Sequence, residues 1–152
     1  MDDFPGAELL ATPDELDDEI QRLAHEGGAL MRSDPPRALA LFQQAYALLP
    51  EPRTSYYDSI WLLRDIGYQQ FRMGRYADGK ATLMTAVKEV SGAIQLADVH
   101  LHLGQCLFEL GEAAADDWLV SAYLMEGPEV FRRQDEKYLA HVRGMLAEPR
   151  TK

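Results

Sequence analysis

Several residue types and patterns on which common protein classes depend are scarce or missing. Cys106 is the single cysteine among 152 residues, so a disulfide framework is excluded. No apolar run approaches the roughly 20 residues that a membrane-spanning helix requires. No segment of useful length alternates apolar and polar residues, and no Asn-Gly or Asp-Gly turn lies between β-branched runs. The sequence therefore favours an all-α fold.

The first residues also lack the features of a secretory signal. Met1–Pro5 are acidic, and no basic region followed by an apolar stretch occurs near them. We therefore expect a cytoplasmic protein that does not enter a membrane. We expect residues 12–147 to form a single α-helical domain, large enough to bury about two thirds of its unfolded surface, and residues 1–11 to form an acidic flexible arm.

Basic residues are absent from two long segments, and the net charge is −10. Residues 1–21 carry eight acids, residues 89–131 carry another eight, and neither segment contains Lys or Arg. Such a field repels nucleic acids and anionic lipids, whose binding depends on Lys and Arg. It would attract a basic protein, although charge runs of this kind also serve solubility alone. The sequence leaves these two roles open.

What the chain does contain is a regular succession of helix start and stop signals. Thr12-Pro13 combines a predicted N-cap with a proline at the first helical position, and Asp34-Pro35 does the same. Gly111 is placed to end a helix. The expected helices cover 12–31, 35–50, 54–74, 75–90, 94–110 and 112–125. One or two more are expected within 128–147, with a break near residues 134 and 135.

A pattern of one small, one large and one small residue recurs in three of these helices. Small residues at a helix crossing let two backbones approach closely, and the large residue between them fills the groove. One helix pair cannot bury its apolar face alone, so such pairs stack. The three copies are Ala38, Phe42 and Ala45; Gly79, Leu83 and Ala86; and Ala115, Leu119 and Ala122.

Together with Ile66-Gly67 and Leu103-Gly104, which precede the second and third copies, this pattern resembles the tetratricopeptide repeat (TPR) family. The resemblance implies an array of three helix-turn-helix pairs closed by C-terminal capping helices. The implied pairs cover about 15–50, 54–91 and 94–126, and the implied capping helices cover about 128–147. The register of the first pair stays open, because its glycine at Gly27 comes early.

The resemblance further implies that the first helix of each pair lines a concave groove that binds another protein. Trp, Tyr and Arg, which dominate binding hot spots, fall on one stripe of the 54–74 helix. The groove candidates are Trp61, Arg64, Tyr68, Phe71 and Arg72, with Gln105 and Phe108 on the 94–110 helix. Such a stripe is also common in protein cores, so packing between repeats is the alternative role.

Three acids near the N-terminus, Asp14, Asp17 and Asp18, form a second candidate contact as part of the acidic arm. They would face a basic partner, because opposite charges accelerate association. The alternative role is the one common to all such charge runs, a solvated surface.

No catalytic or metal-binding motif stands out. His102 and Cys106 share one helix face, but His100 points elsewhere and no fourth ligand lies nearby, so we expect no metal. No Ser, Cys or His stands in a recognisable nucleophile motif. We therefore expect neither an enzyme nor a bound cofactor.

The C-terminal part of the chain suggests a more specific class. Segments 101–111, 122–131 and 135–139 are similar to small bacterial TPR proteins often encoded near polymorphic toxins. This resemblance implies an immunity protein that binds and neutralises a basic toxin domain, acting as a monomer or weak homodimer. The alternatives are a secretion chaperone of the small acidic TPR class and a generic scaffold. The neighbouring genes would distinguish the first two.

Overall fold

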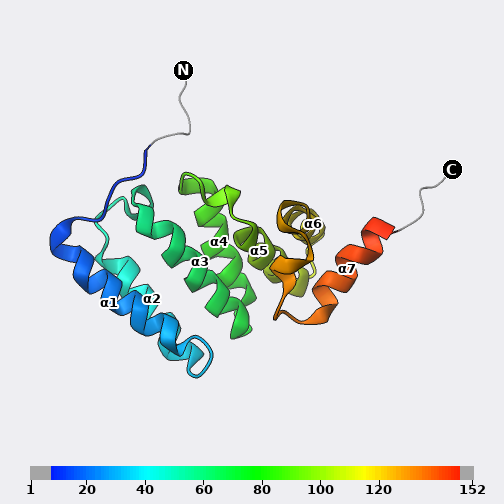
Figure 1. Ribbon diagram of the computed structural model, residues 1–152, viewed down its shortest axis with the longest axis horizontal. Coiled ribbons are helices and arrows are strands. Elements are labelled where there is room, and N and C mark those ends of the chain that lie inside the picture. The colour runs from blue at the N-terminus through cyan, green and yellow to red at the C-terminus, as the bar shows by residue number, and fades with distance from the viewer. Residues whose placement is uncertain (1–7, 148–152) are drawn as a thin grey trace, which may run out of the picture.

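The computed structural model describes residues 8–147, and every element of regular length in them is helical, which confirms the all-α prediction. A single β-bridge between Leu10 and Tyr56 is the exception. The α-helices are α1 (Asp14–Leu30), α2 (Pro35–Leu48), α3 (Tyr57–Arg72), α4 (Tyr76–Glu89), α5 (Ala97–Glu109), α6 (Ala115–Glu126) and α7 (Glu136–Ala147) (Figure 1). The short 3-10 helices are η1 (Arg53–Ser55), η2 (Ala93–Gln95) and η3 (Gly127–Phe131).

The first six α-helices form three consecutive pairs. α1 packs on α2, α3 on α4 and α5 on α6, and each pair also packs on the next through α2 with α3 and α4 with α5. α3 and α5 touch directly, so the first helices of neighbouring pairs are adjacent. The result is an elongated array with α1 and α2 at one end and α7 at the other (Figure 1). None of the described helices is long and apolar enough to span a membrane.

Each pair is closed by one contact between a glycine and a large residue. A Cβ added to Gly67 would lie 2.5 Å from Cγ of Leu83, and one added to Gly104 would lie 2.8 Å from Cγ of Leu119. In the first pair, a Cβ on Gly27 would lie 2.9 Å from the Phe42 ring. Gly27 therefore has in the first pair the position that Gly67 and Gly104 have in the other two.

Gly27 and Gly28, which are neighbours in α1, offer a matched test of the packing of the first pair. A Cβ on Gly28 would meet no atom within 4 Å, so we expect Gly28→Ala to raise the free energy of unfolding by about 0.5 kcal/mol through helix propensity. Gly27→Ala should lower it by about 1 kcal/mol or more, because overpacking against Phe42 outweighs that gain. Urea unfolding measures both values. Equal effects of the two substitutions would contradict the close contact at Gly27.

The start of α2 agrees with the cap predicted from the sequence, whereas the start of α1 does not. The Asp34 side chain accepts a hydrogen bond from the Arg37 backbone N–H at 3.3 Å, which confirms the predicted cap of α2. At α1 the cap residue is Pro13, and no side chain caps the helix. The Thr12 hydroxyl instead donates to Asp58 on α3. The prediction of a Thr12 cap is therefore wrong, because the hydroxyl is used to join two helices.

The predicted flexible arm is also corrected where the structure describes it. Leu10 donates its backbone N–H to Ser55 at 2.7 Å and accepts from Tyr57 at 2.9 Å, and Leu9 packs against a buried cluster on α3 and α4. Residues 8–11 are thus bound to the start of α3. The rest of the predicted arm, residues 1–7, lies outside the described residues.

The C-terminal part closes the array in two steps. The segment 127–135, which begins with η3, leads from the end of α6 to the start of α7 (Figure 1). Phe131, Tyr138 and Val142 are buried with Leu119 in one apolar cluster. The break predicted near residues 134 and 135 is confirmed, since α7 begins at Glu136.

A candidate protein-binding groove

The five predicted residues of α3 lie along one stripe of the helix. We call this stripe the groove, because Tyr68, Phe71 and Arg72 line two hollows of the surface. Trp61 is 45% exposed and Arg72 is exposed, whereas Arg64, Tyr68 and Phe71 are half-buried. The Arg64 guanidinium lies 5.0 Å from the centre of the Trp61 ring, and that of Arg72 lies 5.7 Å from the Tyr68 ring. These distances permit cation–π attraction, which holds the long arginine side chains in place. The stripe is therefore neither fully exposed nor core.

The groove is acidic where α1, α3 and α5 begin. Gln21 on α1 donates to both Asp17 and Asp58, at 3.3 and 3.4 Å, and so bridges α1 and α3. Arg64 pairs with Asp65 at 3.0 Å and with Asp98 of α5 at 3.5 Å. We call Asp17, Asp58 and Asp98, which lie on the first turns of α1, α3 and α5, the acidic end of the groove. Burial raises the pKa of Asp65, and the adjacent Arg64 charge opposes this shift.

A ring of polar contacts supports the middle of the groove. His102 Nδ1 donates to Gln105 Oε1 at 2.9 Å, Gln105 donates to Gln134 at 2.9 Å, and Gln134 donates to the Tyr68 hydroxyl at 3.3 Å. The ring closes because the Tyr68 and His102 rings stack at 4.1 Å. Burial lowers the pKa of His102 from 6.5 to about 4, against the opposing effect of the Gln105 hydrogen bond. His102 is therefore neutral at pH 7 and positions Tyr68.

The structure corrects the proposed role of α5 in the groove. The Gln105 side chain is fully buried, and Gln134 from the 127–135 segment covers it. Phe108 is half-buried, with Tyr138 and His141 of α7 packed edge-on to its ring at 5.3 and 5.1 Å. Gln105 therefore cannot contact a partner in this arrangement. Gln105 was predicted to line the groove because it lies on the first helix of a pair. That pattern does not reveal that the C-terminal part of the chain covers α5.

Lys137 and Tyr138 at the start of α7 are tied to the end of α5 through Glu109. Lys137 Nζ lies 2.7 Å from the Glu109 carboxylate, and the Tyr138 hydroxyl donates to it at 2.6 Å. Burial raises the pKa of Glu109, but the two hydrogen bonds outweigh it and the net shift is downward. Burial and the Glu109 charge both raise the pKa of Tyr138. The carboxylate thus holds α7 against α5.

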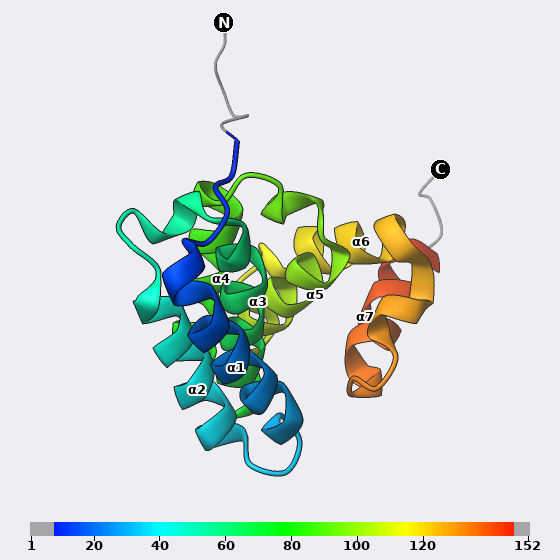
Figure 2. The same ribbon diagram turned by 60° about the vertical axis from the view of Figure 1, so that its left-hand side comes forward.

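A hollow lies at the other end of the groove from the acidic residues, lined by the end of α1, the end of α3 and the segment after η3. Figure 2 shows α1 and α2 on one side of the molecule and α7 on the other. The volume of the hollow is about 800 Å³. Four exposed arginines face it, and no Asp or Glu is among the residues that line it. We call it the arginine cleft, and its lining is Gly28, Ala29, Met31, Arg32, Tyr68, Arg72, Arg132, Arg133 and Gln134.

The arginine cleft continues into a second hollow of about 310 Å³. The two share Tyr68, Arg72, Arg133 and Gln134, and the second adds Lys137, aromatic side chains and the acids Glu109 and Asp135. The positive charge without acids is therefore confined to the arginine cleft, and the second hollow of this trough is mixed in charge. Sequence reasoning identified Tyr68 and Arg72 but missed the other arginines, whose signal was the mildly basic composition of residues 32–88 and 132–152.

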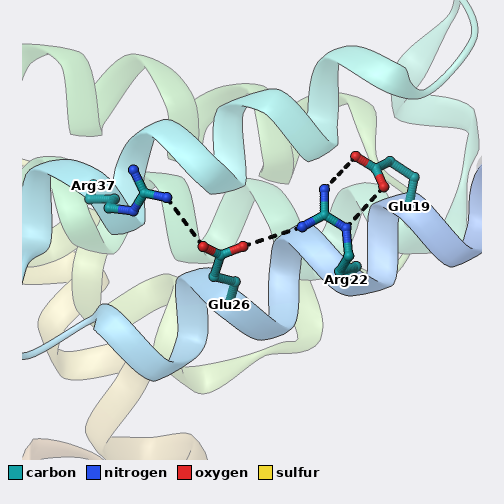
Figure 3. Close-up of polar contacts among 4 residues, drawn as sticks. All are labelled: Glu19, Arg22, Glu26 and Arg37. Carbon is teal, nitrogen blue, oxygen red and sulfur yellow. Dashed lines mark hydrogen bonds and ion pairs between the residues drawn. The ribbon is translucent and has the colours of Figure 1, made fainter.

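The arginines of the cleft differ from those on the outer face of the first pair. There, Arg22 pairs with Glu19 at 2.7 Å, and Glu26 bridges Arg22 and Arg37 at 3.4 and 3.2 Å (Figure 3). In the cleft, Arg132 pairs with Glu129 and Arg72 donates to the Met31 carbonyl. Among residues 8–147, Arg132 is the one cleft arginine that forms an ion pair with an acid.

The three acids assigned to the arm belong to a helix. Asp14, Asp17 and Asp18 all lie in α1, where Asp14 and Asp18 are exposed and Asp17 is half-buried. Negative charge at this position stabilises the helix by its interaction with the helix dipole. Their location on the helix predicted over residues 12–31 is therefore confirmed, the name acidic arm does not apply to them, and Asp17 is part of the acidic end of the groove.

The environments of Cys106 and Ser121 do not favour a nucleophilic role for either side chain. Burial raises the pKa of the Cys106 thiol to about 12, so it is protonated at neutral pH and a poor nucleophile. The Ser121 hydroxyl lies 2.8 Å from His100 Nδ1, but Ser121 is inside α6, where backbone N–H groups are used by the helix. Within residues 8–147, no group of three or more His, Cys, Asp or Glu could hold a metal ion.

Comparison with known proteins adds no relative to this description. No family model matches the sequence, and no curated protein matches it. The function must therefore be argued from the groove and its charges.

Proposed function

We propose that this chain is a protein-binding module without catalysis, and that a segment of its partner lies along the groove of α3. The observation that carries the proposal is the row of Trp61, Arg64, Tyr68 and Arg72, which leads from the acidic end into the arginine cleft. Exposed aromatic side chains braced by arginines combine a large contact area with a low entropic cost of ordering. A fully structural role would not leave Trp61 45% exposed.

The class of partner that we propose is a basic toxin domain, which the chain would neutralise as an immunity protein. The net charge of −10 and the acidic end of the groove support this proposal. Opposite charges steer diffusing proteins together and raise the association rate. The likeness of the C-terminal part to small bacterial TPR proteins encoded near toxins points to the same class.

A secretion chaperone is the second candidate, and the shape of the trough favours it. The arginine cleft runs into the second hollow without a break in its lining, since the two share four residues. A long trough suits an extended client segment better than the convex surface of a folded domain. In this case the client alone would be sensitive to proteases, and the neighbouring genes would encode secreted translocators.

The proposed function is tested with the product of the neighbouring gene. We expect the two proteins to copurify after coexpression, and we expect Trp61→Ala to weaken the complex at least about 30-fold, as for a hot-spot aromatic residue. Calorimetric titration measures this change in the dissociation constant. Leu124→Ala is the matched control, because Leu124 is 72% exposed on α6 and outside the groove. Absence of a copurifying partner, with toxicity unchanged, would contradict the proposal.

The same complex separates the two classes of partner. An immunity protein should abolish the toxic activity of a folded partner at equimolar ratio. A chaperone should instead protect a client segment that proteases digest rapidly when the client is alone. Limited proteolysis of the partner, alone and in complex, measures this difference.

A further inference from the structure

We infer that the arginine cleft binds an acidic segment of the partner, rich in Asp and Glu, while the acidic end of the groove faces a basic or apolar part of the same segment. The inference rests on the proposed protein-binding function and adds the chemistry of the ligand at one end of the groove. Net charge alone would predict a basic ligand for the whole surface, whereas we infer an acidic ligand at the arginine cleft.

The first observation is the concentration of positive charge. Arg32, Arg72, Arg132 and Arg133 face one cleft that no acid lines, on a chain with a net charge of −10. Like charges gathered in one place repel one another, and a carboxylate between them offsets this cost. Arg is also the side chain best suited to carboxylates, since its planar fork donates two parallel hydrogen bonds.

The second observation is the backbone of Arg133. Its φ is 68°, and it is the one residue among 8–147 other than glycine with a positive φ. The other positive φ angles belong to Gly74, Gly92, Gly111 and Gly127. Holding a residue with a Cβ in this region costs roughly 1–2 kcal/mol. Glycine would adopt the turn with less strain, so the arginine is explained by what its side chain does at the cleft.

The shape of the cleft favours a peptide segment over a small anion. The wall at Gly28 is open, since a Cβ there would meet nothing within 4 Å, so a chain can approach closely. Tyr68 is part of the lining, and the trough leads on to the second hollow, where Lys137 is paired with Glu109 and Asp135 also lines the surface. The carboxylates of the segment would therefore lie in the arginine cleft itself. An extended peptide would place carboxylates on the arginines and an apolar side chain on the tyrosine.

The opposite end of the groove argues against a nucleic acid in the same place. Asp58 and Asp98 lie on the first turns of α3 and α5, further along the groove from the arginine cleft. A phosphate backbone that followed the groove would carry the same charge at every step and would meet these carboxylates. A protein segment can change its charge along its length. The polarity of the groove therefore also defines the direction in which the segment lies.

The test uses the full chain and a fluorescein-labelled octapeptide with the sequence Glu-Glu-Leu-Glu-Glu-Tyr-Glu-Glu. The comparison probes replace every Glu by Gln or by Lys, and a single-stranded oligonucleotide of eight thymidines serves as the nucleic-acid probe. We expect fluorescence anisotropy at low salt to show saturable binding of the Glu peptide. We expect at least about tenfold weaker binding of the Gln peptide, since charge-assisted hydrogen bonds to carboxylates are lost.

Two variants assign the binding to the cleft. Arg32→Gln and Arg133→Gly should each weaken binding of the Glu peptide about tenfold. Arg133→Gly should keep or raise the unfolding midpoint of the parent in urea, because glycine adopts the positive φ with less strain, so weaker binding cannot be ascribed to unfolding. Arg22→Gln and Arg37→Gln are the matched controls, because these arginines pair with acids on α1 and lie outside the cleft.

Several results would overturn the inference. These are equal binding of the Glu and Gln peptides, tighter binding of the oligonucleotide or the Lys peptide, and no effect of Arg32→Gln and Arg133→Gly together. Titration of these variants with the copurified partner separates the two proposals. If the partner binds both variants like the parent, the inference fails and the proposed function stands. If no partner binds the parent chain, the proposed function fails.

Discussion

Leu83→Ala is expected to lower the free energy of unfolding by about 3 kcal/mol, because Leu83 is fully buried between α3 and α4. In the parent chain, Gly67→Ala should also destabilise, by about 1–2 kcal/mol, since its Cβ would lie 2.5 Å from Cγ of Leu83. In the Leu83→Ala background this clash is absent. There, Gly67→Ala should become stabilising by about 1 kcal/mol through helix propensity. The sign of the effect therefore reverses.

A double-mutant cycle followed by urea unfolding measures this reversal. Gly104 and Leu119 supply the matched control in the third pair. A Cβ on Gly104 would lie 2.8 Å from the Leu119 side chain and also 3.0 Å from the Leu119 backbone nitrogen. Leu119→Ala leaves the backbone contact in place, so Gly104→Ala should not become stabilising there. Additive effects of Gly67→Ala and Leu83→Ala would refute the packing that we describe.

Acidification is expected to destabilise the protein by about 3 kcal/mol between pH 6.5 and pH 4 through His102 alone. Burial lowers the pKa of His102 in the folded state to about 4, whereas in the unfolded chain it is near 6.5. Between these values the unfolded state binds the proton and the folded state does not. Stability is therefore complete above pH 6.5, falls as the pH decreases, and reaches its full loss below pH 4.

The measurement is urea unfolding at intervals from pH 7 to pH 4, with His102→Asn as the test variant. Asn can donate to Gln105 much as Nδ1 does, but it does not titrate, so its stability profile should be flatter. The variant loses the stacking on Tyr68 and starts from a lower stability at pH 7. The difference between the two profiles gives the contribution of His102 protonation, because the carboxylates titrate in both proteins. Parallel profiles would mean that His102 is solvated in the folded state.

This acid sensitivity should also appear in binding. His102 supports Tyr68, and Gln134 beside it lines the arginine cleft. Protonation of His102 would place a charge in the buried ring of contacts and disturb both residues. We therefore expect binding of the Glu peptide to fall below about pH 5 in the parent chain, as the pH approaches the His102 pKa of about 4. In His102→Asn the loss should be smaller.

Much of the fold could be predicted because helix signals are local. A proline after a capping residue, or a glycine at a helix end, acts through neighbours within one turn, so Asp34 and the break before Glu136 were found correctly. The small-large-small pattern also predicted which residues would be buried, since Phe42, Leu83 and Leu119 are all inside. Thr12 was misassigned because its hydroxyl has a distant competitor, Asp58.

The candidate site could be predicted only in part. The stripe on α3 follows from helical spacing, which is why Trp61 and Tyr68 were identified from the sequence. The periodicity of one helix does not indicate which of its residues a later segment of the chain covers. The burial of Gln105 under Gln134 was therefore missed. The acids of α1 lie on a helix that the sequence predicted, but a charge run alone does not indicate whether its side chains contact a partner or only the solvent.

By itself, the sequence determined the all-helical class, the order of the helices and the burial of the large residue in each small-large-small pattern, since all of these depend on short-range sterics and hydrogen bonding. Only the tertiary structure decided the arginine cleft, the neutral His102 and the polarity of the groove. The physical reason is that these features combine charges and buried surfaces from residues as far apart as Arg32 and Arg133, and electrostatic energy depends on distance in space rather than along the chain.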